Sequence, residues 1–67
     1  MGFRWVYQQG NYWAPFDDRT NLTIEMLYRN GASKVVHVAH LGSVFVNPLL
    51  ATMTLNGHQF VIMRTGS

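Results

Sequence analysis

The absence of cysteine is the feature that most constrains how this chain of 67 residues can fold. A domain of this size buries only about 60% of the surface that its unfolded chain exposes, so its stability is small. Without cysteine, neither a disulfide framework nor a thiolate metal site can add to that stability. Packing and hydrogen bonds must therefore hold together a single domain, residues 1–67. A content of 48% hydrophobic against 12% charged residues favours such a core over disorder.

The first half of the chain predicts a hairpin followed by a helix. Residues 3–8 and 12–16 are rich in strand formers and flank the turn Gln9-Gly10-Asn11. Pro15 favours an edge position, because it cannot donate a hydrogen bond to a neighbouring strand. Residues 17–20 can cap a helix that we expect over residues 21–30. One face of that helix carries Ile24, Leu27 and Tyr28.

The second half predicts four more strands. Residues 34–40 form a β-branched run whose weak alternation indicates that both faces are partly covered. Residues 44–47 form the next strand, and residues 49–52 leave a helical turn and irregular packing open as alternatives. Residues 53–55 and 59–64 flank Asn56-Gly57, a pair typical of a type I′ turn. The order predicts an α+β fold, a six-stranded, mostly antiparallel, strongly bent sheet against one helix.

Few residues qualify as catalytic groups. Of the three carboxylates, Asp17 and Asp18 are adjacent at a helix start, where capping accounts for them. Glu25 lies on the helix without a carboxylate partner, so paired acid and base groups are lacking. We expect no enzymatic activity and no catalytic residue.

The three histidines do not predict a metal site. His37 and His40 are three residues apart in an expected strand and so point to opposite faces, which leaves His58 without a partner set. We expect neither a metal nor another cofactor. Residues 21–23 match the N-glycosylation pattern, but they open a helix, and we interpret the match as incidental.

The charge pattern argues against a nucleic-acid or membrane partner. The net charge of +2 comes from scattered basic residues, namely Arg4, Arg19, Arg29, Lys34 and Arg64. No apolar stretch approaches the length of a membrane span, and no signal-peptide core follows the start. We expect an intracellular location, in the nucleus or cytoplasm. The short ends, residues 1–2 and 65–67, suggest that the domain is cut from a longer protein.

Aromatic residues carry the case for a binding function. The chain has two tryptophans, three tyrosines and four phenylalanines. A chain this small needs most of them for its core, although tyrosine and tryptophan can also stack on a base or on adenine. Tyr7 is the best ligand candidate, because its hydroxyl needs a hydrogen-bond partner and it lies near the end of the first strand.

Several residues also keep the spacing of a known family: Trp5-x-Tyr7, Trp13-x-x-Phe16-Asp17, Thr20, Ile24-Glu25, Tyr28, Gly31, Phe45-Val46, Leu50, Met53 and Met63-Arg64. In this spacing the chain resembles the WWE domain, whose name comes from two tryptophans and a glutamate. These three fall on Trp5, Trp13 and Glu25. The first half matches without a gap. The second half needs about one inserted residue between Phe45 and Met53 and depends on hydrophobic positions.

The resemblance implies a half-barrel sheet closed against one helix. The WWE family occurs in ubiquitin ligases and poly(ADP-ribose) polymerases, and its better-known members bind ADP-ribose or the iso-ADP-ribose unit of poly(ADP-ribose) at the open end of the half-barrel. The family's pocket tyrosine falls on Tyr7, and a second pocket tyrosine falls on Phe45. Three other pocket positions carry Ala14, Leu55 and Phe60, in place of a tryptophan, a glutamine and a basic residue. A shifted alignment would instead bring Thr54 or Asn56 to the position of the glutamine.

Two functions remain open on this basis. In the first, the domain reads ADP-ribose, with adenine stacked on Tyr7 and Phe45 while Arg64, with Gln59 or His58, meets the phosphates. Each lost charge-assisted bond costs such a site roughly 1.5–3 kcal/mol. In the second, the domain is a degenerate WWE domain that has filled its pocket with apolar side chains. It then acts as a protein-interaction scaffold within a ubiquitin ligase or a poly(ADP-ribose) polymerase.

Overall fold

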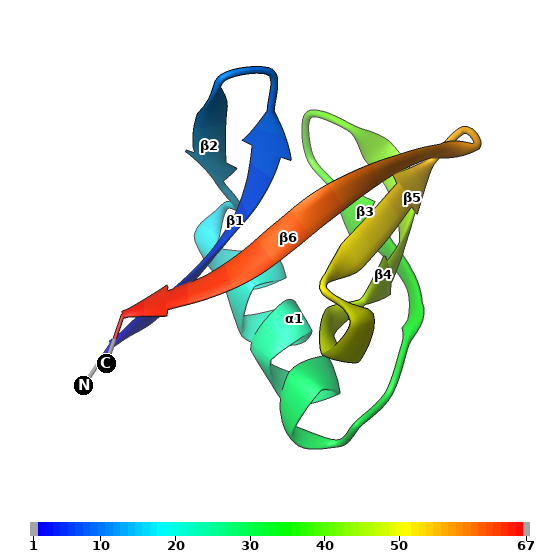
Figure 1. Ribbon diagram of the computed structural model, residues 1–67. Helices are drawn as coiled ribbons and strands as arrows, with labels where there is room; N and C mark the ends of the chain where they lie inside the picture. The colour runs from blue at the N-terminus through cyan, green and yellow to red at the C-terminus, as the bar shows by residue number, and fades with distance from the viewer. Residues whose placement is uncertain (1, 67) are drawn as a thin grey trace.

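The computed structural model describes residues 2–66 and contains one open sheet and one helix (Figure 1). The elements in chain order are β1 (Phe3–Gln9), β2 (Tyr12–Pro15), α1 (Asp18–Arg29), β3 (Lys34–Val38), β4 (Gly42–Asn47), the 3-10 turn η1 (Pro48–Leu50), β5 (Thr52–Leu55) and β6 (His58–Gly66). The six strands lie in the order β2-β1-β6-β5-β4-β3, and each neighbouring pair is antiparallel. The predicted α+β architecture, a bent half-barrel sheet with one helix, is confirmed.

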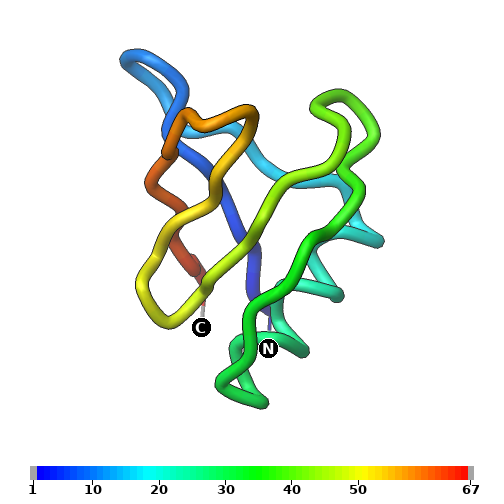
Figure 2. The backbone as a smooth tube through the Cα atoms, turned by 90° about the vertical axis from the view of Figure 1, so that its right-hand side faces the viewer, coloured from blue at the N-terminus to red at the C-terminus, as the bar shows by residue number. Residues whose placement is uncertain are grey.

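The long strand β6 joins the two halves of the sheet. Its first residues pair with β5, and its last residues pair with β1, so the first and last strands of the chain lie side by side (Figure 1). The sheet bends along β6, and α1 packs against one face, as the turned view in Figure 2 also shows. The core between them consists of Trp5, Phe16, Ile24, Leu27, Val36, Val38, Val44, Val46, Met53 and Ile62.

The helix begins earlier than its hydrophobic pattern predicts. Asp17 is the N-cap, and its carboxylate accepts hydrogen bonds from the backbone N–H of Thr20 at 3.2 Å and from the Thr20 hydroxyl at 2.7 Å. The first turn is therefore Asp18–Asn21, whereas we expected the helix to begin at residue 21. The end is close to the prediction, because Gly31 adopts a left-handed φ of +63° that a helix cannot continue.

Strand β3 differs from the sequence-based expectation in length and in exposure. It ends at Val38 instead of residue 40, and its burial alternates cleanly, with Val36 and Val38 buried and Val35 60% exposed. The prediction that both faces are partly covered is therefore wrong. The reason is that β3 is an edge strand covered by α1 on one face only.

The two segments around β5 are defined by backbone conformation. Asn56 and Gly57 have φ values of +50° and +79°, as the predicted type I′ turn requires. The undecided segment before β5 forms the 3-10 turn η1, which ends at Ala51 in a left-handed conformation with φ of +58°. The Ala51 carbonyl then accepts a hydrogen bond from the Ile62 N–H at 2.9 Å, which fixes this turn against β6.

Candidate functional site

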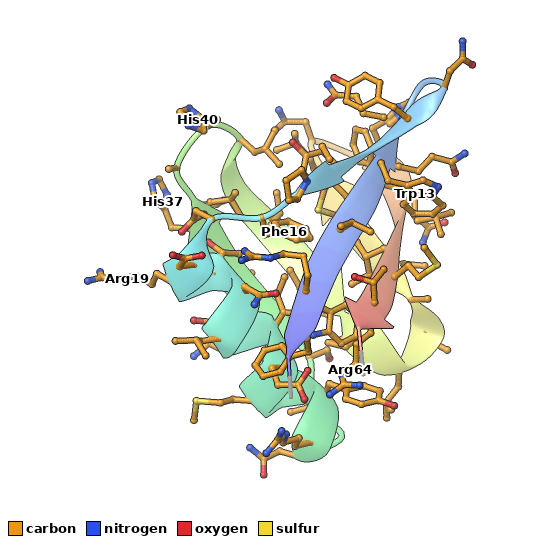
Figure 3. All side chains as sticks on the ribbon, turned by 90° about the vertical axis from the view of Figure 1, so that its left-hand side faces the viewer. Trp13, Phe16, Arg19, His37, His40 and Arg64 are labelled. Carbon is orange, nitrogen blue, oxygen red and sulfur yellow. The ribbon has the colours of Figure 1, made fainter. Side chains whose placement is uncertain are left out.

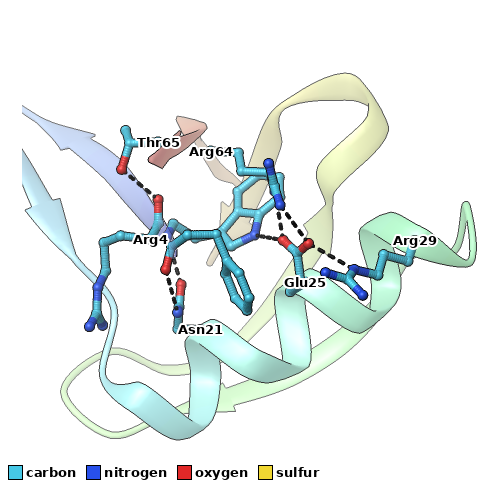
Figure 4. A network of polar contacts seen from close by, with 8 residues as sticks. Arg4, Asn21, Glu25, Arg29, Arg64 and Thr65 are labelled. Carbon is cyan, nitrogen blue, oxygen red and sulfur yellow. Dashed lines mark hydrogen bonds and ion pairs between the residues drawn. The ribbon is translucent and has the colours of Figure 1, made fainter. Parts of the chain in front are cut away.

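A buried carboxylate, Glu25, is the centre of the polar structure in this domain (Figure 4). Its residue is only 3% exposed. Glu25 Oε1 accepts from Trp5 Nε1 at 2.9 Å and from Arg64 Nε at 2.8 Å, and Oε2 accepts from Arg64 Nη2 and from Arg29 Nε, both at 2.9 Å. The two parallel bonds from Arg64 give the bidentate geometry that guanidinium and carboxylate favour. This network joins α1, β1 and β6.

These contacts fix the charges of the network. The bonds from Arg64 to the buried carboxylate, followed by those from Trp5 and Arg29, lower the pKa of Glu25 to about 2 despite the opposing effect of burial. The same bonds raise the pKa of Arg64. The Arg64 guanidinium also lies 5.5 Å from the ring centroid of Phe3 and 5.6 Å from that of Tyr28. Arg64 is thus held within the fold by a charge partner and two rings.

A second side chain of α1, Asn21, anchors β1 to the helix. Its Oδ1 accepts from the backbone N–H of Trp5 at 2.6 Å, and its amide donates to the Phe3 carbonyl at 3.3 Å. Asn21 is 6% exposed. The sequence pattern identified this residue only as the expected start of the helix and as part of an incidental glycosylation match. Its role depends on a strand 16 residues away, which no local pattern reports.

The two tryptophans that carry the family resemblance have different environments. Trp5 is 2% exposed and lies edge-to-face with Tyr28 at 5.4 Å between ring centroids. Trp13 is 41% exposed on the edge strand β2. In Figure 3 it projects on the opposite side of the molecule from Arg19 and His37. Trp5 therefore belongs to the core, whereas Trp13 does not.

The structure brings together an aromatic cluster of Tyr7, Phe16, His58 and Phe60. The Tyr7 ring lies 4.9 Å from Phe16 and 6.4 Å from Phe60, and Phe60 lies 4.9 Å from His58, all between ring centroids. Tyr7, Phe60 and Leu55 are half-buried and pack against the core. Two of the predicted ligand residues, Tyr7 and His58, thus share this cluster, together with apolar side chains.

The other predicted ligand residues do not join the cluster. Phe45 is 44% exposed and alternates with buried neighbours along β4, so it lies on the sheet face away from α1. Thr54 pairs with Phe45 on one side and with Gln59 on the other, which places Gln59 on that same outer face. Tyr7 lies on the core face, opposite the buried Ile62. Tyr7 and Phe45 therefore do not face each other across one pocket.

Three grooves lie along α1, away from the predicted ligand residues. A groove of about 630 Å³ runs between the first half of α1 and β3, and two smaller ones of about 310 and 330 Å³ flank the second half of α1. None of the three is lined by Tyr7, Phe45, His58, Gln59 or Arg64.

The histidines also differ from the expected arrangement. His37 lies in β3, but His40 lies in the turn that follows. The prediction that the two side chains point to opposite faces of one strand is therefore wrong, because the strand ends before His40. Among residues 2–66, no three histidine, aspartate or glutamate side chains are grouped so that they could hold a metal ion. Within the same range, no helix is long and apolar enough to cross a membrane.

Comparison of the chain with models of known protein families found no match, and comparisons with curated proteins and with solved structures found none either.

Proposed function

We propose that this domain is a non-catalytic recognition module of the WWE kind that binds protein. The observation that carries the family assignment is the hydrogen bond from Trp5 Nε1 to Glu25 at 2.9 Å. These two signature residues are 20 positions apart in the chain, and their hydrogen bond joins β1 to α1. This contact supports the interpretation that the signature residues act together in the fold. The half-barrel sheet with one helix supports the same assignment.

The ion pairing and packing of the predicted pocket residues favour protein binding over nucleotide binding. Arg64, the one cation among them, is bound in bidentate fashion to Glu25, and a phosphate would have to compete with that carboxylate. Leu55 and Phe60 both pack on the core, and Phe60 contacts Tyr7, whereas a nucleotide site requires polar groups at such positions. Exposed tryptophan, phenylalanine and methionine side chains are typical of protein interfaces. The surface of this domain exposes Trp13, Phe45 and Met63.

A second candidate function, recognition of ADP-ribose or of iso-ADP-ribose within poly(ADP-ribose), is supported by one observation. No hydrogen bond of the Tyr7 hydroxyl occurs within residues 2–66, although the side chain is half-buried. The Tyr7 ring lies against Phe60, which in turn contacts His58, and a tyrosine hydroxyl beside such rings is a group that an adenine or ribose could engage.

Amide chemical shifts separate the two candidates. We expect ADP-ribose, iso-ADP-ribose and ATP to leave the amides around Tyr7 and His58 unperturbed at millimolar concentration. Tyr12→Ala is the matched control for Tyr7→Ala, because Tyr12 is 59% exposed on β2. Perturbations that Tyr7→Ala removes and Tyr12→Ala retains would overturn the protein-binding proposal in favour of ADP-ribose recognition.

Capture of protein from nuclear and cytoplasmic extract tests the proposal from the other side. Partners from a ubiquitin ligase or a poly(ADP-ribose) polymerase should remain bound when excess ADP-ribose is added, and Tyr7→Ala should retain them. Release of the partner by ADP-ribose would contradict the proposal.

A further inference from the structure

The two edges of the sheet are protected to different degrees. At one edge, β2 has only four residues and ends in Pro15, which has no backbone N–H to offer. At the other edge, β3 has five residues, Lys34–Val38, and no proline. Alternate residues along an edge strand direct an N–H and a C=O away from the sheet. The edge of β3 therefore offers hydrogen-bonding groups to an additional strand.

The largest of the three grooves runs along this edge. Its volume is about 630 Å³, and it lies between the first half of α1 and β3. The helix side is formed by Arg19, Thr20 and Thr23, and the strand side includes Val36 and His37. Arg19 and His37 project on the same side of the molecule in Figure 3. A strand edge next to a helix is the arrangement in which several peptide-binding domains accept an added strand.

The free charges of the domain are concentrated at this groove. Arg4, Arg29 and Arg64 each form an ion pair with a carboxylate. The remaining basic residues, Arg19 and Lys34, form no ion pair within residues 2–66, and both line the groove. One acid, Asp17, also lines it; its oxygens accept hydrogen bonds from Thr20, which orient the carboxylate and leave its negative charge in place. With two cations and one carboxylate among its lining residues, the groove carries a net charge of +1, which favours acidic side chains over basic ones.

We propose that the edge of β3 binds an extended acidic peptide as a seventh strand, with the carboxylates of the peptide meeting Arg19 and Lys34. This inference rests on the proposed protein-binding function and names the surface and the chemistry of the partner. Backbone pairing supplies the general affinity, and the two cations select acidic side chains. In an extended peptide every second side chain lies on the same face, so alternating carboxylates satisfy the geometry.

The test uses a capped peptide in which glutamate alternates with valine, with a lysine and valine peptide of equal length as its counterpart. We expect the acidic peptide to shift the amide signals of β3 and to slow hydrogen exchange along its edge. The counterpart should bind at least about tenfold more weakly, because its charges repel Arg19 and Lys34. Raising sodium chloride from about 50 to about 500 mM should weaken the acidic peptide, because exposed charges are screened.

Variants assign the effect to this groove. Arg19→Gln with Lys34→Gln should weaken the acidic peptide about tenfold. The matched control is Gln8→Glu with Asn11→Asp, which lowers the net charge by the same amount at exposed positions on or beside β1. The control should change affinity less than about twofold. Equal weakening by both variants would overturn the proposal, and so would the absence of binding at millimolar peptide.

The location of the shifts distinguishes this inference from the function on which it rests. Shifts at β2 or on the outer face around Phe45, with β3 unperturbed, would overturn the β3 site and leave protein binding in place. Shifts around Tyr7 with ADP-ribose, together with no binding of either peptide, would overturn the protein-binding function as well.

Discussion

Replacing Glu25 by glutamine should remove much of the stability of this domain. The substitution keeps the size of the side chain and removes its charge. The retained oxygen can still accept from Trp5 Nε1 and Arg64 Nε, but the new NH₂ group faces Arg29 Nε and Arg64 Nη2, which are also donors. Two charge-assisted bonds are therefore replaced by contacts between donors.

Two routes give a similar magnitude for this loss. Two hydrogen bonds to a charged group are worth roughly 1.5–3 kcal/mol each, and the 67% exposure of the Arg29 side chain reduces its share. The total is then about 3 kcal/mol. The fall in the pKa of Glu25 from 4.5 to about 2, which arises largely from the same bonds, corresponds to about 3 kcal/mol of stability at neutral pH. A domain of this size has only about 3–10 kcal/mol in total.

The assay is urea unfolding at low temperature, together with thermal unfolding. Glu25→Gln should lower the Tm by roughly 12–24 °C, since each kcal/mol corresponds to about 4–8 °C in so small a domain. Asp18→Asn is the control, because its side chain is 93% exposed and its ion pair with Arg4 is worth little. We expect this control to change stability by less than about 0.5 kcal/mol.

The pH dependence provides the refuting result. The pKa of Glu25 is lower in the folded state than in the unfolded state, so its contribution is complete above about pH 4.5 and is lost as the pH falls towards about 2. The wild-type domain should therefore lose stability over this window, and Glu25→Gln should show a much flatter profile. If the two profiles run parallel, or if the variant is as stable as the wild type, the network does not stabilise the fold as argued.

Three further predictions concern Asn21, Asp17 and the two tryptophans, and urea unfolding tests each of them. Asn21→Ala should lower the free energy of unfolding by about 2 kcal/mol, because it leaves the buried N–H of Trp5 without an acceptor. A decrease no larger than that caused by an alanine substitution at an exposed position would contradict this prediction. Asp17→Ala should cost about 1 kcal/mol through loss of the N-cap, and part of that difference should vanish in acid, since Thr20 lowers the pKa of Asp17. Trp5→Ala should cost about 3–5 kcal/mol and Trp13→Ala less than half as much, because Trp13 is 41% exposed; equal losses would be inconsistent with these environments.

Local features of the chain could be predicted because they depend on neighbours in the sequence. The Asn56-Gly57 turn and a helix cap within residues 17–20 are confirmed, since each depends on backbone or side-chain chemistry that few residues offer. The edge position of Pro15 is confirmed for the same kind of reason. The helix start was placed too late because the first turn, Asp18–Asn21, carries no hydrophobic periodicity.

The candidate site depended on contacts that no local pattern contains. Arg64 looked like a phosphate ligand by its spacing, but it pairs with Glu25, which is 39 residues away. The register between β4, β5 and β6 placed Phe45 and Gln59 on the outer face, and a shift of one residue would have reversed this.

The sequence by itself thus determined the elements, their order and the residues able to form a core, because propensity, capping and turn chemistry act over a few residues. The tertiary structure alone decided which charges are paired and which face each aromatic side chain occupies. Strand register and contacts between residues far apart in the chain determine the charge pairing and the face of each aromatic side chain. That is why Glu25 and Arg64 stabilise the fold, while Arg19 and Lys34 are left to meet a partner at the edge of β3.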